Sequence, residues 1–185
     1  MHYLHKILVN VKRQTGEDKI ERQELIHQIR AYAEQETECF YEHAFDWRET
    51  DTAGRWQDMY PENVILGVDS PEKILGEVIE CRNQQKAEID ACLTMMEGYA
   101  SMPFSDLAQI IWKRIETPME ESESLSDHLV AFNIKKISRL LDGEYYYDSF
   151  FYDTDEYTAQ ISQTTIQKIK EHLEDWALVF FDQHF

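Results

Sequence analysis

The feature that most constrains the fold is the position of two apolar, β-type segments at opposite ends of the chain. Residues 3–11 are rich in β-favouring side chains, and residues 176–181 form a short run of apolar and aromatic ones. Most of the sequence between them has apolar residues at the three- and four-residue spacing of amphipathic helices. The simplest layered structure is therefore a sheet of N- and C-terminal strands covered by helices.

Four helices are predicted in the middle of the chain, at about residues 19–45, 70–97, 103–117 and 124–141. The second has the clearest start, because Ser70 can cap it, Pro71 suits its first turn and Glu72 lies at its positive end. The chain contains only 6 glycines and 4 prolines, which favours long helices over a β-sandwich with its many turns.

The remaining predicted elements are short. We expect strands at residues 64–68, 145–151 and 157–161, a turn at 153–156, and a last helix at 164–173 capped by Thr164 or Thr165. Together these elements predict an α+β fold, in which several long helices pack on a small mixed sheet of N- and C-terminal strands. We expect a single domain at residues 1–185, with a helical insertion at about 70–141 between the terminal strands.

Charge and composition limit the environments and partners of the chain. Its 36 acidic and 18 basic residues give a formal charge of −18, which repels nucleic acid phosphates and anionic membranes, so we expect neither as a direct partner. The sequence contains no run of about 18 apolar residues, so no transmembrane helix is predicted. The three cysteines form no Cys-x-x-Cys pair, which is typical of free thiols in a reducing compartment, and we expect a cytoplasmic location.

Recognisable catalytic and metal-binding motifs are missing from the sequence. It has no zinc-type spacing of His and Cys, no glycine-rich phosphate loop and no Gly-x-Ser-x-Gly turn. Cys39 and His43 lie four residues apart on a predicted helix, and residues 153–156 form an acidic turn. Cys39 and His43 are more simply interpreted as packed or surface neighbours than as a thiol–base pair, and residues 153–156 as a solvated acidic turn than as a weak Ca²⁺ site. We therefore predict no catalytic residue, metal or cofactor.

The acidic residues are concentrated in two segments without Lys or Arg. Residues 140–167 contain six acids interleaved with tyrosines, and residues 116–127 contain five acids. Carboxylates on a strand pair can imitate the charge spacing of a nucleic acid backbone, and tyrosines add contact area at low entropy cost. We therefore predict partner contacts at Asp142, Glu144, Tyr145, Tyr147, Asp148, Tyr152, Asp153, Asp155, Glu156, Glu120, Glu121 and Glu123. The alternative is an acidic face that only keeps the protein soluble.

A third candidate segment, residues 47–56, combines two tryptophans with charges of both signs. Because Trp and Arg are common in interface hot spots, Trp47, Arg48 and Trp56 are further predicted partner contacts. The alternative is a long loop held in place by tryptophan packing and an arginine–carboxylate pair.

Residues 46–51 (Asp-Trp-Arg-Glu-Thr-Asp), 54–56 (Gly-Arg-Trp) and 175–179 (Asp-Trp-Ala-Leu-Val) carry a resemblance to known proteins. In these segments the chain resembles small acidic accessory proteins of mobile elements in gut Firmicutes, a family for which no catalytic motif can be transferred. The resemblance implies a setting in which antirestriction and anti-CRISPR proteins are common, some of which imitate DNA.

These observations predict a non-enzymatic acidic inhibitor that occupies the basic nucleic-acid-binding surface of a defence nuclease, such as a Cas effector or a restriction enzyme. Two alternatives remain open. A small enzyme or ligand-binding domain would have a pocket around His43, Asp46 and Arg48. A structural or oligomeric accessory protein would expose a large apolar patch. The sequence does not predict the oligomeric state.

Overall fold

The computed structural model describes residues 2–15, 20–40, 45–99, 101–116, 125–143 and 151–184. It confirms the α+β class, with a mixed five-stranded sheet built from strands near both ends of the chain. The chain divides into two compact units. The sheet unit comprises Met1–Asn83 and Gly143–Phe185, and the helical unit comprises Gln84–Asp142.

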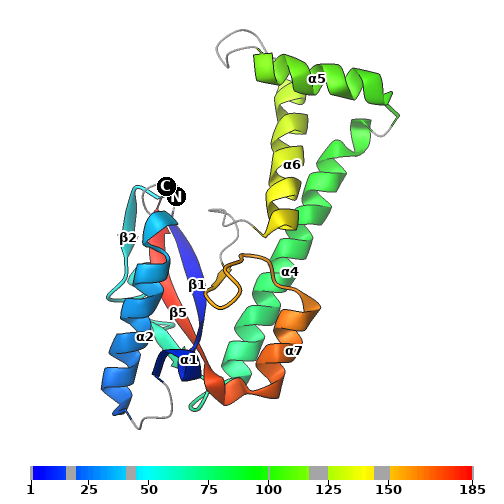
Figure 1. Ribbon diagram of the computed structural model, residues 1–185. Helices are drawn as coiled ribbons and strands as arrows, with labels where there is room; N and C mark the ends of the chain where they lie inside the picture. The colour runs from blue at the N-terminus through cyan, green and yellow to red at the C-terminus, as the bar shows by residue number, and fades with distance from the viewer. Residues whose placement is uncertain are drawn as a thin grey trace. The chain divides into compact units, whose positions relative to one another are not determined.

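The sheet is organised around two long strands from opposite ends of the sequence. β1 (His2–Asn10) pairs antiparallel with β5 (Trp176–His184) along all nine residues, from His2 opposite His184 to Asn10 opposite Trp176. β4 (Phe151–Asp153) runs parallel to the other side of β1. β2 (Trp47–Glu49) and β3 (Val64–Leu66) pair antiparallel with different parts of β5. Figure 1 shows β1 beside β5, with the two chain ends close together.

Helices bury both faces of the sheet. One face, with Leu8 and Phe180, packs against the first half of α4 (Pro71–Met96) and against α7 (Gln163–Glu171). The other face, with Ile7 and Phe181, packs against α2 (Arg22–Glu36), and α1 (Val11–Thr15) follows directly on β1. Because both faces are covered, residues 176–181 of β5 are apolar without interruption, as the sequence predicted. Burial of each large apolar side chain contributes about 1.5–3 kcal/mol to folding.

Local hydrogen bonds explain where two helices begin or end differently from the prediction. α7 is capped by Ser162, not by Thr164 or Thr165: the Ser162 hydroxyl accepts from the Thr165 amide at 2.9 Å, and the Thr165 hydroxyl accepts from the Ser162 amide at 3.3 Å. α2 ends at Glu36, because a turn at Thr37, whose hydroxyl donates to the Ala33 carbonyl at 2.7 Å, interrupts the predicted helix before residues 38–40 become helical again.

The helical unit contains the second half of α4, the short 3₁₀ helix η2 (Glu97–Tyr99), α5 (Phe104–Glu116) and α6 (Leu125–Asp142). The bounds of α5 and α6 agree with the predicted helices at 103–117 and 124–141. Lys136 Nζ on α6 lies 3.8 Å from Glu88 Oε2 on α4. Among the described helices, none combines the length and the apolar composition needed to cross a membrane.

The predicted strand at residues 157–161 is wrong. Thr158 makes only an isolated bridge to Asp153, and Tyr157 has a left-handed backbone with a φ of 53°. Residues 154–157 form the turn, so Asp153 belongs to β4 and not to the turn. The predicted strand at 145–151 falls mostly outside the described residues, and its last residue, Phe151, begins β4.

Two glycines of the sheet unit should respond oppositely to a methyl group. Gly54 has a φ of +51°, and a Cβ there would lie 2.3 Å from Asp182 Oδ2, whereas a Cβ at Gly76 in α4 meets nothing within 4 Å. We expect Gly54→Ala to lower the free energy of unfolding by more than about 1 kcal/mol. Gly76→Ala should raise it by about 0.5–1 kcal/mol. Urea denaturation measures both, and equal effects would contradict the described backbone at Gly54.

Candidate functional site

The structure places two of the predicted contact residues inside the fold. Tyr152 and Asp153 belong to β4 and are buried, because β4 pairs with the central strand β1 and is covered on both sides. The ring of Tyr152 packs edge-on against Phe40, with centroids 4.9 Å apart. The prediction that Tyr152 and Asp153 contact a partner is therefore wrong, because neither side chain has enough exposed surface for such a contact.

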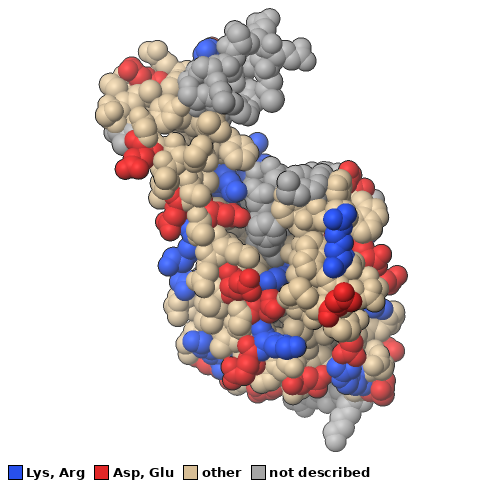
Figure 2. Space-filling model, turned by 180° about the vertical axis from the view of Figure 1, so that it is seen from behind, with Lys and Arg blue, Asp and Glu red and all other residues tan. Residues whose placement is uncertain are grey.

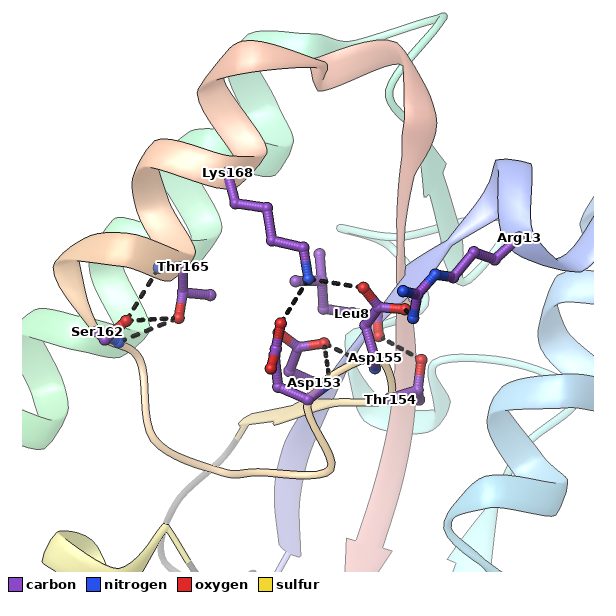
Figure 3. Close-up of polar contacts among 9 residues, drawn as sticks. Leu8, Arg13, Asp153, Thr154, Asp155, Ser162, Thr165 and Lys168 are labelled. Carbon is purple, nitrogen blue, oxygen red and sulfur yellow. Dashed lines mark hydrogen bonds and ion pairs between the residues drawn. The ribbon is translucent and has the colours of Figure 1, made fainter.

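The acids beside them are neutralised within the chain (Figure 3). Lys168 on α7 donates to Asp155 Oδ2 at 2.6 Å and to Glu156 Oε1 at 2.8 Å, and Arg13 contacts the other oxygen of Asp155. The Asp155 side chain is only 5% exposed. Asp153 Oδ1 accepts the backbone N–H groups of Asp155 and Glu156, at 2.8 and 3.3 Å. This turn is therefore a structural polar cluster that ties β4 to α1 and α7.

The other predicted acids divide into exposed and undescribed residues. Asp142 is exposed at the end of α6 and accepts a hydrogen bond from Ser138 Oγ at 3.3 Å, and Glu156 is exposed beside Lys168. Seven predicted contacts lie outside the described residues: Glu144, Tyr145, Tyr147, Asp148, Glu120, Glu121 and Glu123.

The edge strand β2 brings a tryptophan and several carboxylates to the surface of the sheet unit. Trp47 is 43% exposed, and Asp46 and Asp51 are exposed at the two ends of the strand. Glu49, half-buried on the same face as Trp47, accepts the backbone N–H groups of Asp51 and Thr52 at 3.0 and 3.1 Å. The β2 surface is defined as Asp46, Trp47, Glu49 and Asp51.

The arginine of β2 is directed away from this surface. Strand alternation sends Arg48 to the opposite face, where its Nη1 lies 3.4 Å from Thr37 Oγ1 and its Nη2 lies 3.7 Å from Glu34 Oε1. The Arg48 side chain is only 10% exposed, so the prediction that Arg48 is an accessible contact residue is wrong. Burial, and then the positive charge of Arg48, lower the pKa of His5 to about 3, so His5 is neutral. The outward-facing groups of β2 are therefore acidic and aromatic.

Trp56, the third predicted contact of this segment, follows the alternative interpretation. It lies in the 3₁₀ helix η1 (Gly54–Trp56) and packs, partly buried, against the hydrophobic core. The segment is thus a docked loop, held by Trp56 on one side and by Arg48 on the other, and only Trp47 remains as an exposed aromatic group.

Two histidine–aspartate pairs lie beside Trp47, because His2 and His184 are in register with it in the sheet and their side chains share its face. His2 Nδ1 lies 2.8 Å from Asp182 Oδ1, and His184 Nδ1 lies 2.7 Å from Asp46 Oδ1. The pKa of Asp46 is lowered by its hydrogen bond to His184. The His2 ring meets both Trp47 and His184 edge-on, with centroids 5.5 and 4.9 Å apart. These contacts join β1, β2 and β5 and fix the orientation of the tryptophan.

Metal-binding and thiol chemistry find little support in the described residues. Among them, no group of three or more His, Cys, Asp or Glu side chains is arranged to hold a metal ion. Burial raises the pKa of the Cys81 thiol to about 11, which leaves it a protonated, unreactive thiol at neutral pH. His43, part of the pocket considered above, lies outside the described residues.

A cavity of about 340 Å³ lies elsewhere in the sheet unit, beside β3 and the start of α4. Its lining includes Arg22, Glu62 and Asp69, and contains neither Asp46 nor Arg48. The Arg22 guanidinium is occupied within the chain, because it donates to both oxygens of Glu62 at 2.8 and 2.6 Å and to Asp69 at 2.9 Å. Arg22, Glu62 and Asp69 therefore satisfy one another, and Lys73 also lines the cavity.

The surplus of acid belongs mainly to the sheet unit. It contains 26 acidic and 12 basic residues, for a formal charge of −14, and the helical unit contains 10 and 6, for −4. On the face seen in Figure 2, acidic and basic side chains are interspersed over the sheet unit, without a continuous acidic stripe among the coloured residues. The charge of that face is thus locally balanced in many places.

Comparisons with protein-family models, with curated proteins and with solved structures gave no match. The function is therefore inferred from the geometry of the described residues.

The acids of the β2 surface were not among the predicted contacts, although the sequence contains a signal for one of them, Asp46. Residues 31–47 include five acids and no Lys or Arg, a third segment of the kind found at 116–127 and 140–167. The supporting histidines could not be found in this way, because His2 and His184 meet only through the pairing of the terminal strands.

Buried Asp153 generates a prediction about stability and pH. Burial raises the pKa of Asp153 in the folded protein above its value in the unfolded chain, so the folded state binds this proton more tightly. The contribution of Asp153 to stability therefore falls as the pH rises from the unfolded-state pKa to the folded-state pKa. Asp153→Asn removes the titration while keeping an oxygen for the two backbone amides. The variant should gain stability relative to wild type from about pH 4 upward, measured by urea denaturation at several pH values. A difference that is constant or shrinks with rising pH would contradict the buried carboxylate.

Proposed function

We propose that the protein is a non-enzymatic acidic binding protein whose β2 surface docks on a basic, nucleic-acid-binding surface of another protein. The observation that carries the proposal is the arrangement at β2, where exposed Trp47 lies among carboxylates while Arg48 is buried behind it. Such a surface is complementary to a groove lined by Lys and Arg.

Trp47 is suited to be the anchor of this contact. Tryptophan is enriched in interface hot spots, because one rigid ring buries a large area at a low cost in side-chain entropy. The contact of Trp47 with the His2 ring restricts its orientation before any partner binds. Preorganisation of this kind raises affinity without adding contacts.

The charge of the sheet unit supports a basic partner. A formal charge of −14 on this unit steers positively charged surfaces toward it and accelerates association at low salt. Basic grooves of the required size are built by proteins that bind nucleic acid. The resemblance to accessory proteins of mobile elements favours a defence nuclease among them, a Cas effector or a restriction enzyme. Exposed Asp142 and Glu156 remain candidate contacts, whereas Tyr152, Asp153 and Asp155 have structural roles.

The proposal is tested by inhibition of DNA cleavage. A panel of restriction endonucleases and Cas nucleases is assayed on a labelled duplex, with the protein in tenfold molar excess, at 0.1 and 0.5 M NaCl. We expect at least one enzyme to be inhibited at low salt and much less at high salt, because screening shortens the range of the attraction. No inhibition across the panel would reject a nuclease as the partner.

Variants of the β2 surface separate a specific contact from general acidity. Trp47→Ala should weaken binding to the inhibited nuclease by about 30-fold or more, the loss of a hot spot of ~2 kcal/mol. The double variant Asp46→Lys, Asp51→Lys should mainly slow association. Its matched control is Glu171→Lys, Glu174→Lys, which changes the charge equally at exposed acids outside the β2 surface. Biolayer interferometry measures both rates, and equal effects of the two double variants would contradict docking through β2.

A further inference from the structure

A second exposed surface lies on the helical unit and differs in chemistry from the β2 surface. Of the ten large hydrophobic side chains that are most exposed among the described residues, six belong to this unit: Leu93, Met95, Phe104, Trp112, Phe132 and Leu141. On the face of this unit shown in Figure 2, uncharged side chains lie among acidic and basic ones. Exposed apolar side chains mark an interaction site where they form a continuous patch.

The most exposed of these side chains lie in one row on α5. Phe104 is 90% exposed and Trp112 is 60% exposed, and exposed Ala108 lies midway between them. Residues four apart lie on the same side of a helix, so the three form a continuous row. In the adjacent row of exposed residues, Ser105 and Gln109 are polar but uncharged, and Lys113 lies at the C-terminal end. The row of Phe104, Ala108 and Trp112 is therefore apolar, and the basic side chain beside it lies toward the Trp112 end.

The sequence of this row is symmetric about its centre, and from this symmetry we infer that α5 pairs antiparallel with α5 of a second copy of the chain. With Ala108 at the twofold axis, Phe104 of each copy lies against Trp112 of the other. The small side chain at the centre lets the helices approach closely, while the rings fill the space on either side.

The low net charge of the helical unit also permits contact between two copies. The helical unit has a formal charge of only −4, so two copies repel each other least where this unit forms the contact. Glu116 continues the row at the C-terminal end of α5. In the antiparallel pair it reaches the N-terminal end of the facing helix, where the helix dipole favours a carboxylate.

The available area sets the strength of the pairing. Aromatic side chains bury about 150–250 Å² each when fully covered, so Phe104 and Trp112 supply roughly 300 Å² per copy. Stable complexes bury about 800 Å² per partner. We therefore expect a reversible dimer with a dissociation constant on the order of 10–100 µM.

Sedimentation velocity of the full chain from 5 to 300 µM tests the dimer. The average mass should rise from 22.0 kDa toward twice that value with concentration. Phe104→Glu should weaken the dimer at least tenfold, because it places two carboxylates in an apolar contact. Met59→Glu, which adds the same charge at an exposed apolar residue of the sheet unit, should leave it unchanged. A chain that stays monomeric at 300 µM, or equal effects of the two variants, would overturn the inference and leave the row to a different protein.

Cysteine cross-linking tests the antiparallel arrangement. In a Cys39→Ser background, which removes the exposed native thiol, Ala108→Cys places two cysteines at the twofold axis. Mild oxidation should convert this variant to a disulfide-linked dimer. Asp106→Cys lies two residues, about 200°, around the helix and should not cross-link. Cross-linking through Asp106→Cys but not through Ala108→Cys would overturn the proposed pairing even if a dimer forms.

Discussion

The pairing of β1 with β5 holds the sheet unit together, because every other strand attaches to one of these two. It joins the first and last strands of the chain, so a loop containing nearly all residues must close before this pairing forms. Closing so long a loop costs conformational entropy and slows folding. The burial of apolar side chains compensates for this entropy cost, because helices cover both strands on both faces.

The interior of the sheet unit contains a buried lysine that is paired with a carboxylate. Lys6 on β1 is buried, and its Nζ lies 2.6 Å from Glu77 Oε2 on α4. The other oxygen of Glu77 accepts from the Tyr60 hydroxyl at 2.7 Å, and the Tyr60 ring stacks on Phe180 with centroids 3.8 Å apart. Buried charges are tolerated only with such partners. Acids used in this way are unavailable to another protein, so the formal charge overstates the acidic contact surface.

Hydrophobic periodicity was sufficient to predict the architecture, because a buried helix face or a buried strand leaves a direct pattern in the sequence. It did not predict the role of residues 153–156. Asp155 is neutralised by Arg13, 142 residues away, and no local pattern indicates that contact. The sequence does not predict the strand β2 either, because its three residues are too few to show a periodic pattern. They adopt an extended conformation because they pair with β5. Of the candidate site, Trp47 was predicted, but the burial of Arg48 depends on the face that this pairing selects.

The unequal distribution of charge allows one chain to carry two surfaces that respond oppositely to salt. A net charge of about 2–8 in magnitude keeps a small domain soluble, and the sheet unit exceeds this at −14. That excess opposes the nonspecific association that exposed Phe104 and Trp112 would otherwise promote. Added salt screens the β2 surface from a basic partner, and it also reduces the repulsion between two acidic copies. A contact through α5 is apolar and is not weakened by screening, so ionic strength separates the two surfaces experimentally.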